Sequence, residues 1–317
     1  KLANTWQMFS QAASSPVIPS AVLFLQGFGS WGAPTASSVN AAAVSRCLSA
    51  ASRLTASTRA LASGNKEFLT RRMSGISWDG SGTQEELMHR DECVLVNERD
   101  ELVGHASKYD CHRFDSETPR GRLHRAFSVF LFDSEDRLLL QQRAGDKITF
   151  PGVWTNTCCS HPLHGHSPSE VDAAAAVAAG TVPGVKAAAV RKLRHELGIP
   201  AEQVPTDKFR FLTRLHYCAG DVETYGQNPP WGEHELDYIL FIKADVDLSP
   251  NPEEVQDVKY VTFPELQKML TPGNGLMWSP WFRIIAKHFL GEWWKDLETT
   301  LNTIQYVEVD KIHYLEA

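Results

Sequence analysis

The first 66 residues of this 317-residue chain contain no aspartate or glutamate, although the chain as a whole carries 38 acidic residues. This stretch is rich in Ala and Ser, and Arg46, Arg53 and Arg59 recur through residues 39–63. An acid-poor, hydroxyl-rich and weakly amphipathic segment is typical of an organelle transit peptide. We therefore predict a leader over residues 1–75, directed to a plastid, with the mitochondrion as second choice. The alternative is a disordered low-complexity tail with no targeting role.

Long apolar runs and excess basic charge are also missing, and cysteines are few. The absence of any run of eighteen apolar residues argues against a transmembrane helix. A formal net charge of −7 and a pI near 6.0 argue against a nucleic-acid-binding protein. Few cysteines are scattered through a long chain, which indicates free thiols in a reducing compartment. They are Cys47, Cys93, Cys111, Cys158, Cys159 and Cys218.

Beyond the leader, short apolar runs alternate with segments of helical periodicity. This pattern predicts one catalytic domain over residues 76–317, built as a mixed α/β sandwich. We read residues 171–179 as an alanine-rich insertion. Gly198 is read as the C-cap of a helix over residues 186–197. Strands are expected at 93–97, 102–105, 125–132, 138–142, 209–218, 235–244 and 255–263, and helices at 186–197, 265–270 and 281–294.

The segment Thr155-Asn156-Thr157-Cys158-Cys159-Ser160-His161-Pro162 places two thiols beside a histidine in a polar turn. A thiol is a strong base or nucleophile near neutral pH once its pKa is lowered. A neighbouring histidine indicates either that activation or a metal site. In extended backbone, adjacent side chains diverge, so only one of the two thiols can face a substrate.

A second polar segment, Trp231-Gly232-Glu233-His234-Glu235, lies far downstream. On a strand, Glu233 and Glu235 point to the same face and His234 points to the other. Two carboxylates on one face repel each other unless a cation or a shared proton holds them together. The alternative is a pair of solvated acids on an edge strand.

Together these segments resemble the type I isopentenyl-diphosphate isomerases. The resemblance runs from about Lys108 to about Trp294 and also includes Leu123-His124-Arg125-Ala126-Phe127-Ser128 and Ser279-Pro280-Trp281-Phe282. It implies a Nudix-like α/β/α sandwich with a mixed sheet. It also implies conversion of isopentenyl diphosphate to dimethylallyl diphosphate for isoprenoid synthesis, with magnesium accompanying the substrate.

The resemblance implies two metal positions. Glu196 would help to hold Mg²⁺ on the substrate diphosphate. A separate divalent ion would be bound inside the protein, and its mixed imidazole and carboxylate ligands suit Zn²⁺ or Mn²⁺ better than Ca²⁺. The implied ligands of this ion are His112, His124, His161, Glu233 and Glu235. The other histidines singled out are read as surface or packing residues: His105, His164, His166, His195 and His216.

The resemblance also implies how the substrate is bound and converted. Cys159 would act as a thiolate that removes a proton from C2, opposite Glu235, which supplies a proton with the help of Tyr217. Which group delivers the first proton stays open. Trp281, and with weaker support Trp154, would present a π face to the carbocation. The diphosphate contacts would be Lys108, Arg143 and Lys147, because Arg and Lys suit phosphate recognition.

Two other functions compete with this interpretation. A Nudix diphosphate hydrolase would need glutamates where this chain has Lys192 and His195, so only Glu196 remains of that helix motif. A non-catalytic protein with a structural zinc site would not need two carboxylates and a spare thiol. We expect a small-molecule substrate as the partner, no nucleic acid and no membrane span. The sequence does not determine the oligomeric state, and we expect a monomer.

Overall fold

The structure is a computed structural model and describes residues 82–316. The predicted leader, residues 1–75, and the domain boundary at residue 76 lie outside the described residues, so both stay predictions.

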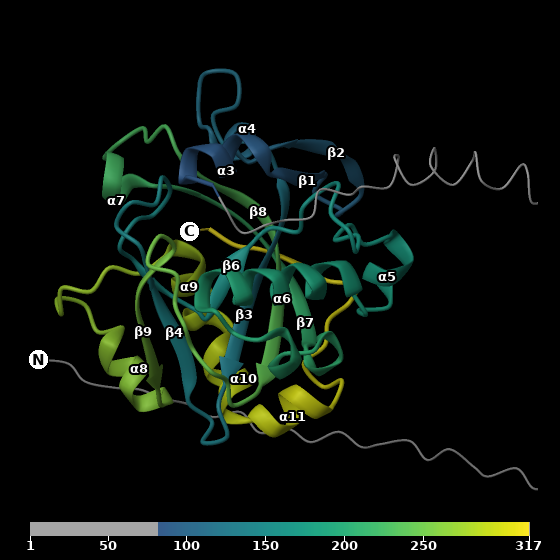
Figure 1. The fold of residues 1–317 in the computed structure, drawn as a ribbon, viewed down its shortest axis with the longest axis vertical. Helices are drawn as coiled ribbons and strands as arrows, with labels where there is room; N and C mark the ends of the chain where they lie inside the picture. The colour runs from purple at the N-terminus through teal and green to yellow at the C-terminus, as the bar shows by residue number, and fades with distance from the viewer. Residues whose placement is uncertain (1–81, 317) are drawn as a thin grey trace, which may run out of the picture. The chain divides into compact units, whose positions relative to one another are not determined.

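A ten-stranded mixed sheet forms the centre of the domain (Figure 1). Strands β3 and β8 are parallel neighbours, and β7 pairs antiparallel with β8. The main path of the sheet runs β10 (Ile312–Tyr314), β7 (Arg210–Gly220), β8 (Gly232–Lys243), β3 (His124–Phe132), β1 (Glu92–Val96), β2 (Leu102–Ser107). Off this path, β4 (Leu138–Arg143) pairs with β3, β5 (Trp154–Thr155) and β9 (Val255–Val261), and β6 (Cys158–Ser160) pairs with β3.

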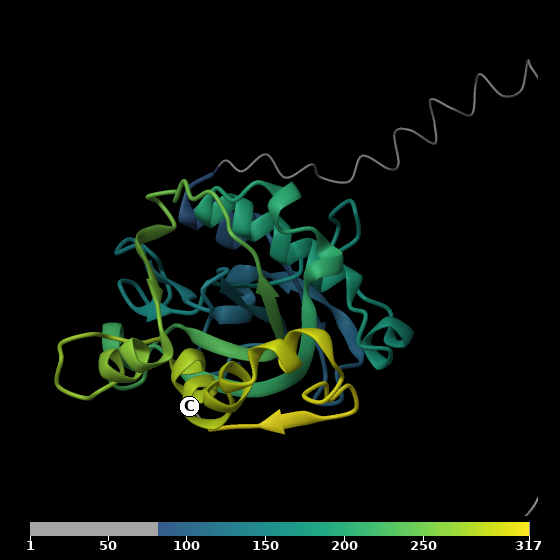
Figure 2. The ribbon, with the colours of Figure 1, turned by 90° about the horizontal axis from the view of Figure 1, so that it is seen from below.

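Both faces of the central strands are buried, because every residue of β3 is inaccessible to solvent. Val129 and Leu131 pack on one face with helix α6 (Pro183–Leu197), whereas Phe130 and Phe132 pack on the other. That second face is covered by C-terminal helices, namely α9 (Pro280–Ile285), α10 (Gly291–Lys295) and α11 (Leu297–Asn302). Figure 2 shows α6 and these helices on opposite sides of the strands. The predicted α/β/α sandwich is confirmed.

The remaining helices are short and lie around the sheet. They are α3 (Gln84–Arg90), α4 (Lys108–His112), α5 (Ala174–Ala178), α7 (Val222–Tyr225) and α8 (Phe263–Met269), with 3₁₀ turns at Ala201–Gln203 and Thr206–Lys208. The predicted insertion at 171–179 therefore contains one short helix. No helix among residues 82–316 is long and apolar enough to cross a membrane.

All three predicted helices differ in their bounds from the observed ones, and the helix predicted at 265–270 is α8, which begins two residues earlier and ends one residue earlier. Helix α6 begins at Pro183, three residues before the predicted start, because proline fits the first helical position, where no backbone N–H bond is lost. It ends at Gly198, whose φ of 66° provides the predicted C-cap. The predicted helix at 281–294 is divided by a π-helical turn, Ala286–Leu290, between α9 and α10. Spacing alone does not reveal a single inserted residue of this kind.

Candidate active site

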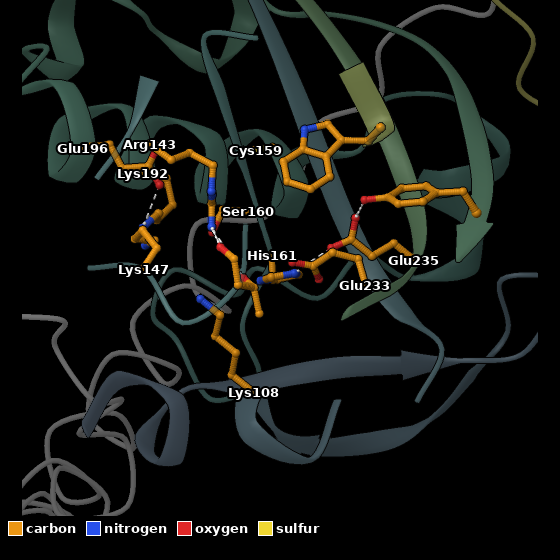
Figure 3. Close-up of a pocket in the computed structure, with 13 residues that line it drawn as sticks. Lys108, Arg143, Lys147, Cys159, Ser160, His161, Lys192, Glu196, Glu233 and Glu235 are labelled. Atoms are coloured by element: carbon orange, nitrogen blue, oxygen red, sulfur yellow. Dashed lines mark hydrogen bonds and ion pairs between the residues drawn. The ribbon is translucent and has the colours of Figure 1, made fainter. Parts of the chain in front are cut away.

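One pocket gathers most of the residues singled out in the sequence (Figure 3). On one side of it lie basic side chains and Glu196, and on the other lie Glu233 and Glu235, with His161 between them. Of the two tryptophans predicted to face a carbocation, Trp281 lines the pocket and Trp154 does not. The complete lining is Lys108, Arg143, Lys147, Thr149, Cys159, Ser160, His161, Lys192, Glu196, Tyr217, Glu233, Glu235 and Trp281.

Five buried side chains form a cluster whose ligand atoms all lie within 4.8 Å of one another. His112 ends α4, His124 begins β3, and His161 follows β6. Glu233 and Glu235 lie on β8, where Glu235 is in register with His124 on the neighbouring parallel strand. The structure thus brings together all five residues implied by the sequence resemblance.

The imidazoles present lone pairs to this cluster. His112 Nδ1 lies 2.6 Å from the carbonyl oxygen of Lys108, and His124 Nδ1 lies 2.7 Å from that of Arg122. A carbonyl can only accept, so each Nδ1 carries a proton, and Nε2 is the ring nitrogen left to bind a metal ion. Backbone carbonyls commonly orient metal-binding histidines in this way.

Several ligand atoms lack a hydrogen-bonding partner although they are buried. His112 Nε2 lies 2.7 Å from Glu233 Oε2, yet neither atom makes a hydrogen bond of acceptable geometry, and His124 Nε2 also has no partner. His161 Nε2 lies 2.8 Å from Glu235 Oε1. Unpaired buried acceptors are costly, and a cation between them would remove that cost. The residues present therefore fit a divalent metal ion.

The electrostatics of the cluster agree with this interpretation. Burial lowers the pKa of His124 to about 3, with the charge of His112 acting in the same direction. Burial also lowers the pKa of His161 well below its ordinary value. Burial raises the pKa of Glu235 well above its ordinary value, and the carboxylates of Glu233 and Asp237 add to this rise. A divalent cation would bind the neutral imidazoles and would shift the crowded carboxyl groups toward their ionised form.

The opposite orientations of neighbouring β8 residues predict a clear difference in metal content. His234 stacks on His216 with ring centroids 5.2 Å apart and is not part of the cluster. We expect Glu233→Gln to weaken binding of the internal metal by at least about 10–100-fold, and His234→Gln to leave it nearly unchanged. Elemental analysis of dialysed protein would measure both. Equal metal loss in the two variants would contradict the observed orientation.

The two neighbouring thiols face different environments, as predicted. Cys158 is completely buried in the core on the α6 face, whereas Cys159 is half-buried and lines the pocket. Burial raises the pKa of Cys159, and the positive charge of Arg143 opposes that rise only in part.

Glu235 belongs to a buried acidic network that the sequence revealed only in part. The hydroxyl of Tyr217, in register with Glu235 on β7, donates to Glu235 Oε2. Asp237 lies two residues further along β8, accepts a hydrogen bond from Ser128 Oγ at 2.8 Å, and has its pKa raised by burial to about 7. The alternation that singled out Glu233 and Glu235 also continues to Asp237, so period-two spacing could have identified it.

The predicted diphosphate contacts lie together in the pocket. Arg143 donates to the carbonyl oxygens of Thr149 and Phe150 at 2.8 and 3.0 Å, and its guanidinium carbon lies 5.8 Å from the centroid of the Trp281 ring. Burial lowers the pKa of Lys147 to about 8, although its ion pair with a carboxylate opposes that change. Lys108, the first residue of α4, also lines the pocket.

Lys192 and Glu254 complete this charged region and were missed as site residues. Lys192 Nζ lies 3.0 Å from Glu196 Oε1 and 3.7 Å from Glu254 Oε2, and Lys147 Nζ lies 2.6 Å from the same Glu254 oxygen. Glu196 Oε2 accepts from Gln141 at 2.9 Å. The i, i+4 spacing of Lys192 and Glu196 on one helix face could have indicated Lys192. No sequence signal indicated Glu254.

Replacing Lys192 by methionine is expected to weaken substrate binding. The change removes a buried cation and leaves Glu196 and Glu254 repelling an anionic ligand. A charge-assisted hydrogen bond contributes about 1.5–3 kcal/mol, so KM should rise by about 10–100-fold with a smaller change in kcat. Steady-state kinetics would measure this, with the exposed Lys268→Met on α8 as control. An unchanged KM in folded Lys192→Met would exclude this role.

Comparison with known proteins agrees with the fold. The NUDIX domain family matches residues 122–281, so the chain is a NUDIX-domain protein. An isopentenyl-diphosphate delta-isomerase of Aspergillus fumigatus is 52% identical over 227 residues, covering 68% of this chain and 76% of the relative. The chloroplastic isopentenyl-diphosphate Delta-isomerase II of Arabidopsis thaliana is 48% identical over 236 residues, covering 73% and 78%. This chain belongs to the isopentenyl-diphosphate delta-isomerase family.

A further relative is the chloroplastic isopentenyl-diphosphate Delta-isomerase 1 of Cannabis sativa, 50% identical over 219 residues, covering 68% of this chain and 71% of the relative. Membership of this family favours an isomerase over the NUDIX hydrolase and the structural zinc protein considered from the sequence.

Proposed function

We propose that this protein isomerises isopentenyl diphosphate to dimethylallyl diphosphate by protonation and deprotonation through a tertiary carbocation. The observation that carries the proposal is a single pocket that joins a buried histidine and glutamate cluster, one thiol and four basic side chains. The basic side chains suit a diphosphate. Buried acid and base groups suit movement of a double bond, because one group must donate a proton to the substrate and another must remove one.

Cys159 and Glu235 are the proposed proton-transfer groups. Glu235, with Tyr217, supplies a proton to C4 of the substrate, which leaves a cation at C3. Cys159 removes a proton from C2, and the electrons of that C–H bond form the new double bond. The roles reverse in the back reaction. Since burial raises the thiol pKa, formation of the thiolate depends on nearby positive charge, of which Arg143 contributes most.

The proposed cofactors occupy the two sides of the pocket. His112, His124, His161, Glu233 and Glu235 would hold Zn²⁺ or Mn²⁺, which fixes the orientation of Glu235. Glu196 would help to hold the Mg²⁺ that accompanies the diphosphate, because Mg²⁺ binds through one or two carboxylates together with substrate phosphates. Lys108, Arg143 and Lys147 would bind the diphosphate, and the Trp281 ring would face the cation.

The reaction is tested by incubating the protein with isopentenyl diphosphate and Mg²⁺ in heavy water. We expect dimethylallyl diphosphate that carries deuterium, because the proton added at C4 comes from exchangeable groups. Mass spectrometry would detect the label. Release of inorganic phosphate instead of isomer would identify a hydrolase, and absence of both products would exclude either activity.

We also propose that the protein acts in plastids and as a monomer. The acid-poor residues 1–66 and the two chloroplastic relatives support the location. Fusion of residues 1–75 to a fluorescent protein would test it, and an even cytosolic distribution would oppose it. Sedimentation of the active protein would measure its mass.

Removal of the leader is expected to leave catalysis intact. A chain that begins at Ser74 retains every residue of the pocket. We therefore expect kcat and the thermal midpoint to match those of the full chain. A truncated protein that unfolds or loses most of its turnover would show that the domain begins earlier than residue 76.

A further inference from the structure

Glu92, His105 and His164 form a second group of metal-ligating side chains, separate from the buried cluster of five. Their ligand atoms all lie within 4.8 Å of one another. Glu92 begins β1, His105 lies on β2, and His164 follows His161 by three residues. From the sequence, the two histidines were read as surface or packing residues. We propose that these three side chains bind a second divalent transition-metal ion, with Zn²⁺ as the expected occupant.

The spacing of the ligand atoms already approaches that of a zinc site. His105 Nδ1 lies 3.0 Å from Glu92 Oε2, and His164 Nδ1 lies 3.3 Å from the same oxygen. In a tetrahedral site with bonds of about 2.0–2.2 Å, neighbouring ligand atoms are about 3.3–3.6 Å apart. The two imidazole rings stack with centroids 3.8 Å apart and an interplanar angle of 3°. Small side-chain rotations would therefore place an ion between the three atoms.

The backbone holds the three residues in place without a metal. The amide of His164 donates to the carbonyl oxygen of Glu92 at 2.8 Å, and Leu163 forms an isolated bridge with Cys93. His105 is opposite Val94 in the β1–β2 hairpin. A site supported by paired backbone loses little conformational entropy when an ion binds, which favours binding.

The chemistry of the three ligands selects the class of ion. Imidazole nitrogen suits Zn²⁺, Ni²⁺ and Cu²⁺, whereas Mg²⁺ and Ca²⁺ prefer all-oxygen ligands. The side chains of His105 and His164 are 44% and 46% exposed, so an ion reaches them directly from solvent and water completes its coordination. The bound ion would connect the β1–β2 hairpin to the segment that carries His161 and would stabilise the folded chain.

The test uses the full chain in which one equivalent of internal metal has been verified by elemental analysis. Isothermal titration with Zn²⁺ should show one further equivalent. The double variant His105→Ala/His164→Ala should lose at least about 10–100-fold in affinity for that equivalent, and Glu92→Gln should weaken it. His288→Ala, which removes an exposed histidine elsewhere, should leave it unchanged. Added Zn²⁺ should raise the thermal midpoint of the unmodified chain more than that of the double variant.

The proposal is overturned if no further equivalent binds, or if the double variant binds it as tightly as the unmodified chain. Binding that appears only at millimolar Zn²⁺ would indicate an adventitious ion and would also overturn it. These readouts do not require isomerase turnover, so they stand apart from the proposed function. An exposed double alanine variant is expected to fold, and circular dichroism would verify this before titration.

Discussion

Replacing Cys159 by serine is expected to reduce isomerisation by at least about 10²–10⁴-fold, the usual contribution of a positioned acid–base group. A serine hydroxyl is much less acidic than a thiol and provides almost no anion near neutral pH. Cys159 is the thiol that lines the pocket, and its burial already makes the thiolate difficult to form. Conversion of isopentenyl diphosphate, followed by product chromatography, would measure the loss.

Cys158→Ser is the matched control for this result. Its side chain is completely buried in the core beside α6 and does not line the pocket. We therefore expect a lower thermal midpoint, because a hydroxyl is buried among apolar groups, but a near-normal kcat for the folded fraction. Both variants must retain their internal metal. A fully active Cys159→Ser, or an inactive Cys158→Ser of normal stability, would reverse the assignment of the two thiols.

Glu235→Gln is the second change from which we expect a large loss, again about 10²–10⁴-fold in kcat. An amide has no carboxyl proton to transfer and contributes no negative charge to the metal cluster. The side chain of Glu235 is in contact with both His161 and Tyr217, so this substitution affects the metal and the proton path together. Activity should therefore be measured with the variant saturated by the metal found in the unmodified protein.

Tyr217→Phe distinguishes the effect of Glu235 on the metal from its effect on proton transfer. The substitution removes only the hydroxyl that donates to Glu235 and leaves the five cluster residues in place. We expect normal metal content with reduced kcat, because the orientation of the Glu235 carboxyl is less well fixed. If metal-saturated Glu235→Gln retained turnover within tenfold of the unmodified protein, Glu235 would not be a proton-transfer group.

The orientation of the side chains along the strand that carries Glu233 and Glu235 could be predicted from the local sequence pattern alone. The i, i+2 spacing predicts that Glu233 and Glu235 share one face of a strand and that His234 takes the other, and the structure confirms this. The strand itself begins at Gly232, three residues before the predicted start at residue 235. The same reasoning separated Cys158 from Cys159. Strand geometry repeats every two residues whatever the surrounding fold, so these orientations follow from the chain itself.

Contacts between residues that lie far apart in the sequence were harder to predict. Glu254 lies far from both Lys147 and Lys192 in sequence, and only the folded chain places its carboxylate within 4 Å of both ammonium groups. The meeting of Glu92, His105 and His164 similarly depends on how a hairpin and a loop pack together. Charge partners of this kind leave no periodic signal, because no single element contains both members.

The sequence by itself determined the sandwich, the two polar segments and the orientation of the side chains along them, since motif identity and period-two spacing are local properties. Only the tertiary structure decided their protonation. Burial raises the pKa of the Cys159 thiol, and no local pattern in the sequence indicates that direction. Desolvation depends on every element packed around a group, and it therefore becomes defined only when the whole domain has folded.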